Sequence, residues 1–238
     1  MAESQTQRAK PTDYQLIAFD ADDTLWDCQS HFDRVEQQLY RLIAPYCADP
    51  AAELYQTEAA NMADLGYGCK AFTISVLETA LRVGQGRIGH ADLAALLHAG
   101  KQLLQLPATP LPSVSETLSL LRQRLSIPMA VFTKGELQDQ ENKLHRSGLL
   151  PFFDSVEITS DKGQPEFLAL CRRHNIQPSQ LLMVGNSLKS DIAPALAVGA
   201  WAVHIPFHVT WQLEAHADIE HPRLTKLHHF AELLDLLA

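Results

Sequence analysis

One stretch of the chain, QLIAFDADDTLW at residues 15–26, joins a short apolar run directly to a cluster of acids. The apolar run has the length of a strand that is buried on both faces of a parallel sheet. Asp20, Asp22, Asp23 and Asp27 follow it closely. Carboxylates this close repel one another, and a buried carboxylate without a partner is costly. A fold that contains this stretch must therefore bring cations to the end of the strand.

Further apolar runs indicate more strands of the same kind. They cover residues 128–133, 181–185 and 200–205, with a weaker run at 155–159. Helical patterns lie between them at 136–147, 164–174 and 190–198, and the first and last of these end before Gly148 and Gly199. Glycine is the usual residue after the end of a helix. The alternation predicts an α/β fold with a doubly wound parallel sheet.

The region between residues 27 and 106 differs, because it contains helical patterns and no strand-like run. The patterns cover residues 32–44, 51–64, 70–83 and 91–104. The gap between the first two predicted strands is several times the roughly 30 residues of a parallel crossover. We therefore expect a helical domain at 27–106, inserted into a core formed by 14–26 and 107–238. Residues 1–13 are polar and predict a flexible tail.

Chemically active residues follow the predicted strands. Ligands bind beyond the C-terminal ends of the strands in open parallel sheets, so these residues are expected to meet at one edge. In chain order they are Asp20, Asp22, Thr133, Lys134, Gly135, Lys162, Asn186 and Asp191.

Four segments carry a resemblance to a known family. FDADDTLW, VFTKG, DKGQPEF and VGNSLKSDI resemble, in this order, the motifs of the haloacid dehalogenase-like hydrolase superfamily, specifically its magnesium-dependent phosphatases. The resemblance covers roughly residues 14–26 and 108–210. It implies a Rossmann-like core, and the inserted helical region resembles the cap of this family.

The resemblance also implies roles for the acids. Asp20 would be the nucleophile that forms an aspartyl-phosphate, and Asp22 the general acid and base. Asp22 would need a raised pKa, which repulsion from Asp20 can supply. Mg²⁺ would be held by the Asp20 carboxylate and the Asp22 carbonyl, with Asn186 and Asp191 on its other side. Asn186 departs from the family pattern, which usually has an acid there, so metal affinity and activity depend on this position.

The remaining motif residues would hold the phosphate. Thr133 and the backbone N–H groups of Lys134 and Gly135 would bind phosphate oxygens, and Lys162 would neutralise Asp20 and the transferring group. Specificity would come from the cap. Its loop at residues 65–70 carries Tyr67, which could stack on a substrate, and Lys70, which could meet a substrate charge.

Composition limits the kinds of partner that the chain can bind. The net charge of −9 provides no basic surface for a nucleic acid polymer. No apolar run reaches the roughly 18 residues of a membrane span. Four scattered cysteines predict free thiols in a reducing compartment. We therefore expect a cytoplasmic protein, a monomer or homodimer, that acts on a small phosphorylated metabolite such as a nucleotide, a sugar phosphate or phosphoglycolate.

Three other functions compete with a phosphatase. Asn186 favours a 2-haloacid dehalogenase, but such enzymes lack the acid at the position of Asp22. A phospho-accepting receiver domain would place its aspartate on a later strand and has no large helical insertion. A weakly active family member that binds a ligand or partner is the third, and only Asn186 motivates it.

Overall fold

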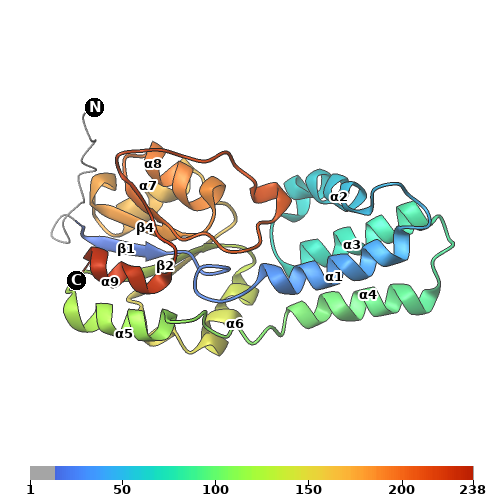
Figure 1. The fold of residues 1–238 in the computed structure, drawn as a ribbon, viewed down its shortest axis with the longest axis horizontal. Coiled ribbons are helices and arrows are strands. Elements are labelled where there is room, and N and C mark those ends of the chain that lie inside the picture. Colours follow the sequence, from blue (N-terminus) through green and yellow to red (C-terminus); the bar gives the residue numbers. More distant parts are fainter. Residues whose placement is uncertain (1–13, 238) are drawn as a thin grey trace.

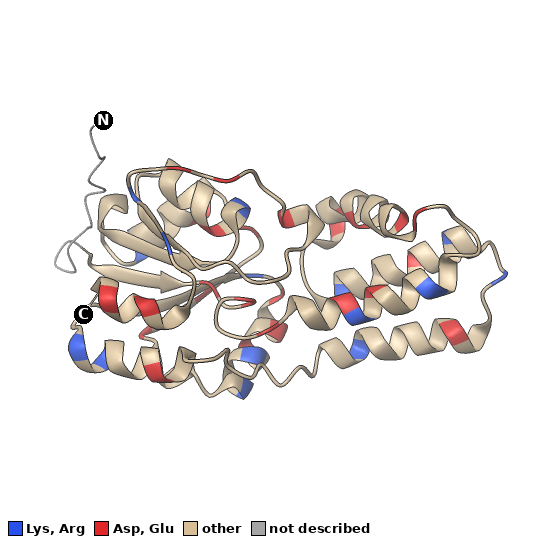
Figure 2. Cartoon of the chain, viewed as in Figure 1, with Lys and Arg blue, Asp and Glu red and all other residues tan. Residues whose placement is uncertain are grey.

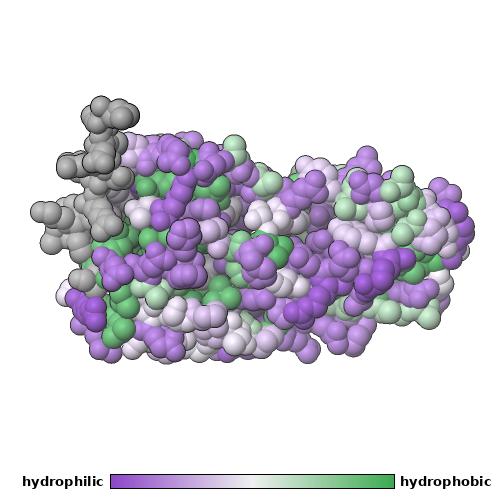
Figure 3. Space-filling model, viewed as in Figure 1, coloured by the Kyte–Doolittle hydropathy of each residue, from purple (hydrophilic) through white to green (hydrophobic). Residues whose placement is uncertain are grey.

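The computed structural model describes residues 14–237, so the predicted tail at residues 1–13 lies outside the described residues. The described chain forms two parts that lie side by side, a sheet covered by helices and an elongated group of helices (Figure 1). The face in view is mainly hydrophilic, with scattered apolar atoms (Figure 3). Among residues 14–237, no helix has the length and apolarity that crossing a bilayer requires.

The sheet has six parallel strands in the order β3-β2-β1-β4-β5-β6. Five of them match the predicted runs to within two residues at each end. The strands are β1 (Leu16–Phe19), β2 (Met129–Lys134), β3 (Ser155–Thr159), β4 (Leu181–Gly185), β5 (Trp201–His204) and β6 (Leu224–Lys226). The last strand has only three residues, of which Leu224 alone is buried, so its apolar pattern is too short to recognise.

Helices cover both faces of the sheet, as a doubly wound fold requires. Ile17 and Phe19 of β1 point into one apolar cluster with α5 (Val114–Arg124), α6 (Leu137–Ser147) and α9 (Leu233–Leu237). Leu16 and Ala18 point into another with α7 (Gln164–Arg173) and α8 (Ala193–Ala197). A π-helical turn, Leu188–Ile192, precedes α8. The fold confirms the predicted α/β class.

Between β1 and β2, the chain forms the predicted helical insertion. Its helices are α1 (Gln29–Ile43), α2 (Pro50–Leu65), α3 (Cys69–Gly84) and α4 (His90–Leu103). They share a hydrophobic cluster of their own, which runs from Cys28 to Leu106. α5 follows in the same insertion but packs on the sheet. Local signals set the ends, since Asp49 caps α2 by accepting the N–H of Ala52 and Pro50 opens the helix.

Close packing of α3 against α4 gives a test of the helical region. Gly100 of α4 is buried against Thr73 of α3, and a methyl group there would lie 2.5 Å from Thr73 Cγ2. Overpacking of this kind costs about 1–3 kcal/mol, whereas alanine in place of glycine favours a helix by about 1 kcal/mol. We predict that Gly100→Ala lowers the melting temperature in thermal unfolding.

Gly89→Ala is the matched control in the same region. Gly89 has φ −70°, and a methyl group there would meet its nearest atom, Asp92 Oδ2, at 3.4 Å. Gly89 is the N-cap of α4, where glycine is preferred to alanine, so this variant should unfold slightly below the wild-type temperature and above Gly100→Ala. Equal melting temperatures for the two variants would show that the contact between α3 and α4 is not tight.

Candidate active site

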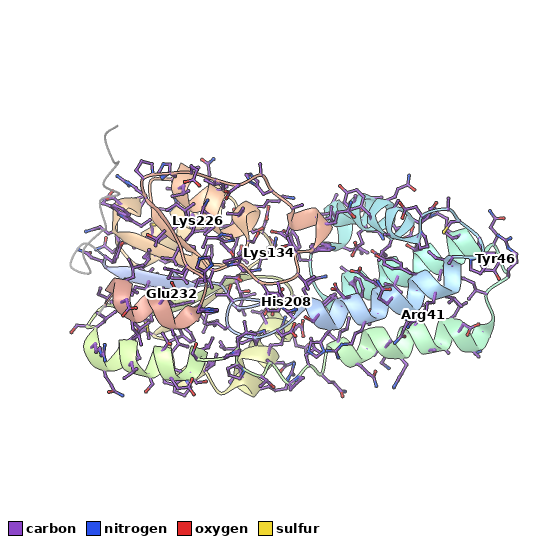
Figure 4. The ribbon with its side chains drawn as sticks, viewed as in Figure 1. Arg41, Tyr46, Lys134, His208, Lys226 and Glu232 are labelled. Carbon is purple, nitrogen blue, oxygen red and sulfur yellow. The ribbon has the colours of Figure 1, made fainter. Side chains whose placement is uncertain are left out.

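The three central strands, β2, β1 and β4, end side by side, and the predicted residues meet at this edge. The eight residues predicted at the strand ends all line one cavity: Asp20, Asp22, Thr133, Lys134, Gly135, Lys162, Asn186 and Asp191. The cavity encloses about 1150 Å³ of empty space, including its open mouth. Its lining runs from the strand ends to α1, α2 and α3, so it has room for a substrate beyond the phosphate group. It lies where the core meets the helical region, as the position of Lys134 in Figure 4 shows.

Lys162 lies between two carboxylates at the centre of this edge. Its ammonium binds Asp20 Oδ1 in a short ion pair and Asp191 Oδ1 at 2.7 Å, and its side chain is 1% exposed. The other oxygen of Asp191 accepts the N–H of Ser187 at 2.9 Å. Gly185 permits this close approach, because a methyl group there would lie 2.5 Å from Asp191 Cγ. The lysine thus supplies the positive charge that the acid-rich strand end requires.

The acids affect each other's protonation. The pKa of Asp20 is raised to about 7, first by burial and then by the charge of Asp191, although the ion pair with Lys162 lowers it. Burial alone would lower the pKa of Lys162, but Asp191 and Asp20 together raise it above its usual range. Lys162 therefore stays charged, and Asp20 needs further positive charge to be fully ionised at neutral pH.

Asp22 is held differently from what we expected. Lys143 Nζ binds its two carboxylate oxygens at 2.8 and 2.7 Å, Gln140 Nε2 donates at 2.8 Å and Trp26 Nε1 at 2.7 Å. Burial would raise the pKa of Asp22, but Lys143, Gln140 and Trp26 outweigh it and lower the pKa. The prediction that repulsion from Asp20 raises this pKa is therefore wrong, because sequence reasoning missed Lys143.

Asn186 and its neighbours fit a cation. The amide oxygen of Asn186 lies 3.2 Å from Asp20 Oδ2, 3.3 Å from the Asp22 carbonyl oxygen and 3.1 Å from Thr24 Oγ1. Hydrogen bonding alone favours the amide turned by 180°, in which its N–H group donates to these three oxygens. Oxygens that converge in this way are the ligands Mg²⁺ prefers. Within residues 14–237, no group of three or more His, Cys, Asp or Glu side chains is placed to bind a metal. A cation here would therefore depend on the Asn186 amide and the Asp22 carbonyl as ligands.

The predicted phosphate-binding loop matches only in part. Thr133 is buried and lines the cavity, and its hydroxyl has one weak contact, 3.5 Å to the Lys134 carbonyl. Gly135, however, donates its N–H to the Thr159 carbonyl at 3.0 Å, so that N–H is not free for phosphate. Gly135 instead makes room for Gln140, whose Nε2 would lie 2.8 Å from a methyl group at this position. With φ 138°, the backbone there also favours glycine.

The helical region contributes Tyr67 to the cavity but not Lys70. The Tyr67 ring lies 3.8 Å from Lys134 Nζ and contacts Trp211 edge-on, with ring centroids 6.0 Å apart. Lys70 forms a short ion pair with Glu136 of the core and does not line the cavity. The expectation that Lys70 meets a substrate charge therefore finds no support. This ion pair joins the helical region to the core, and so does a hydrogen bond that Cys69 Sγ donates to Asp139 Oδ2 at 3.3 Å.

A loop after β5 completes the site and was missed from the sequence. Glu214 on this loop forms a short ion pair with Lys134 and accepts from Ser187 Oγ and Ser190 Oγ, each at 2.5 Å. Trp211 Nε1 donates to Glu58 Oε2 of α2 at 3.2 Å. The loop carries no motif, and only its place in space identifies it.

The other two acids of the opening stretch shape the chain. Asp23 has φ 62°, and its carboxylate accepts the N–H groups of Cys28 and Gln29 at 2.8 and 2.9 Å. Asp27 accepts the N–H of Ser30 at 3.2 Å. Both therefore shape the turn after β1 and position the start of α1. Figure 2 shows this acidic loop (red) at the junction of the two parts.

Comparison with known proteins identifies relatives. The family described as "Hydrolase: haloacid dehalogenase-like hydrolase" matches residues 14–199. Pyrimidine 5'-nucleotidase YjjG of Escherichia coli is 26% identical over 237 residues, which cover 93% of this chain and 98% of that protein. A haloacid dehalogenase-like hydrolase of Xanthomonas campestris is 28% identical, with a TM-score of 0.83 over 94% of this chain and 92% of that one. The magnesium-bound YfnB structure of Bacillus subtilis is 20% identical, with a TM-score of 0.64 over 94% and 98%.

The position of Asn186 leads to a test of the metal site. An acid there adds negative charge beside Asp20 and Asp191, so Asn186→Asp should bind Mg²⁺ more tightly. We predict that the Mg²⁺ concentration giving half of the rise in melting temperature falls about tenfold relative to wild type.

Asn186→Ala is the matched control, because it removes the amide oxygen without adding charge. It should need a higher Mg²⁺ concentration than wild type for the same rise in melting temperature. A midpoint that is the same in all three proteins would exclude residue 186 as a ligand. Because the measurement follows unfolding, it does not depend on activity.

Proposed function

The chain belongs to the haloacid dehalogenase-like hydrolases, and from this premise we propose that it hydrolyses small phosphate monoesters in a Mg²⁺-dependent reaction. One observation carries the proposal. Asp20, paired with Lys162, and Asp22, two residues on, line the same cavity, next to oxygens that suit a cation. The similarity to a pyrimidine 5'-nucleotidase supports this choice. We also propose a cytoplasmic setting, in which thiols such as those of Cys28, Cys69 and Cys171 stay reduced.

In the proposed first step, the Asp20 carboxylate attacks phosphorus and the bond to the leaving oxygen breaks. Lys162 offsets the negative charge of Asp20 and of the phosphoryl group as they approach. Thr133 can donate its hydroxyl to a phosphate oxygen, since its present contact is weak. Mg²⁺, held by Asp20, the Asp22 carbonyl and Asn186, with Asp191 next to them, would supply the further positive charge that Asp20 needs in order to be ionised.

In the second step, water attacks phosphorus of the aspartyl-phosphate, Asp22 takes a proton from this water, and the bond from phosphorus to the Asp20 carboxylate breaks. The lowered pKa of Asp22 suits this step, because the carboxylate is ionised and ready to accept. The first step needs Asp22 to give a proton to the leaving oxygen. Because the pKa of Asp22 is lowered, only a small fraction of the enzyme has Asp22 protonated at neutral pH. Esters with poor leaving groups need this proton most, so their hydrolysis should depend most on Asp22.

A haloacid dehalogenase is the second candidate, because Asn186 stands where the phosphatases usually have an acid. In that reaction the Asp20 carboxylate would displace halide from carbon, and no leaving oxygen would need a proton. Chloride released from 2-chloropropionate, without phosphate release from any ester, would favour this function. Binding of vanadate with no turnover of either substrate would favour a binding protein instead.

The proposed function predicts Mg²⁺-dependent turnover of p-nitrophenyl phosphate that EDTA abolishes. Asp20→Asn should reduce this turnover to background while inorganic vanadate still protects the protein against thermal unfolding. The amide has the shape of the carboxylate but is a very poor nucleophile. If the variant kept the wild-type rate, Asp20 would not be the nucleophile, and no turnover by wild type would contradict the function itself.

Asp22→Asn should separate the two steps. Nitrophenolate leaves without a proton, so the variant should still release one equivalent of it in a rapid burst. The following steady rate should fall about 100-fold or more, because no base activates the water. Rapid mixing with absorbance detection measures both phases. A full steady rate, or the absence of a burst, would contradict this division of roles.

A further inference from the structure

The cavity continues from Asp20 into the helical region, and its far half has a distinct chemistry. Glu36 on α1 and Glu58 on α2 line this half, together with the rings of Phe32, Phe72 and Trp211. A leaving group attached to a phosphate at Asp20 would extend into this space. Its lining therefore decides which esters fit.

The far half of the cavity holds two carboxyl groups, Glu36 and Glu58, and no cation of the described chain pairs with either. Three lysines line the cavity, and each belongs to the core and is already paired: Lys134 with Glu214, Lys143 with Asp22 and Lys162 with Asp20. From the helical region, no Lys, Arg or His is among the described lining residues. A second anionic group on the substrate would therefore meet carboxylates and no free cation.

The far half offers acceptors rather than donors. Glu58 is 6% exposed and accepts only the indole N–H of Trp211, at 3.2 Å, among the described residues. Glu36 accepts the hydroxyl of Tyr40 at 2.9 Å. Asn61 donates its amide N–H groups to Ser75 and Glu78, at 3.1 and 2.8 Å, which leaves its carbonyl oxygen as an acceptor. A ligand there gains most by supplying N–H donors.

Aromatic rings flank these acceptors. Trp211 and Tyr67 contact edge-on, and Phe32 and Phe72 lie with centroids 4.8 Å apart. Flat groups pack favourably against such rings. Trp211 comes from the core and Tyr67 from the helical region, so this wall forms only when the two parts are together.

Burial raises the pKa of Glu58 to about 7, which lets it accept or, when protonated, donate at neutral pH.

We propose that this half of the cavity is a leaving-group subsite for flat groups that carry N–H donors and no negative charge, with Glu58 and Trp211 as its selective residues. The proposal rests on the proposed function. Nucleobases have this chemistry. Leaving groups with a carboxylate or a second phosphate, such as those of phosphoglycolate and sugar bisphosphates, are rejected by like charge.

The test compares kcat/KM for nucleoside monophosphates and for phosphoglycolate, with p-nitrophenyl phosphate as reference, all with Mg²⁺. Wild type should prefer the nucleotides by at least about tenfold. Glu58→Gln keeps the shape but removes the charge. It should lower kcat/KM for the nucleotides about tenfold, mainly through KM, and raise it for phosphoglycolate. A wild-type circular dichroism spectrum and cooperative thermal unfolding would show that the variant is folded.

Asp64→Asn is the matched control. Asp64 lies on the same helix, α2, is exposed and does not line the cavity, so the preference should stay at its wild-type value. The proposal is overturned if wild type hydrolyses phosphoglycolate as well as nucleotides, or if Glu58→Gln leaves the preference unchanged. Failure of the proposed function is distinct, since wild type would then not turn over p-nitrophenyl phosphate.

Discussion

The buried contact of Lys162 with Asp20 and Asp191 is the interaction on which the rest of the site depends. Without it, two carboxylates would lie close together in the centre of the molecule, where each isolated charge is very costly. Removing one partner of a buried ion pair typically costs about 3–5 kcal/mol. The same contact requires β1, β4 and the turn after β3 to end at one point, and it requires Gly185 to let Asp191 approach. The same contact thus supports the fold and, in the proposed reaction, would hold Asp20 in place for attack.

The remaining chemistry divides between the two parts of the molecule. The core holds every charged group near Asp20, and a second buried lysine, Lys143, fixes Asp22 in the same way that Lys162 fixes Asp20. Among residues 14–237, the helical region places no Lys, Arg or His in the cavity, and it supplies rings and acceptors. The loop after β5 links the parts, because Glu214 binds Lys134 of the core and Trp211 reaches Glu58 of α2. The core would therefore carry the reaction and the junction would select the substrate.

The sequence predicts the sheet, the helical insertion and the edge where the acids meet, because each strand is an apolar run that ends in polar residues. The sequence is less informative about contacts between residues from distant segments of the chain. Lys143 is a lysine within a helix and has no local sign of burial, yet it reverses the expected pKa of Asp22. The N–H of Gly135 was assigned to phosphate, but it pairs with Thr159 on the neighbouring strand. Trp211 and Glu214 belong to a loop without periodicity, so only the three-dimensional structure brings them to the site.

The central claim is that Asp20 accepts the phosphoryl group. Rapid mixing of the wild-type protein with ³²P-labelled nucleoside monophosphate and Mg²⁺, stopped by acid within one turnover, tests it most directly. We predict protein-bound label that hydroxylamine releases, as it does for an acyl phosphate, and mass spectrometry should locate the modification at Asp20. Turnover with no label on the protein, or with label on another residue, would contradict the account.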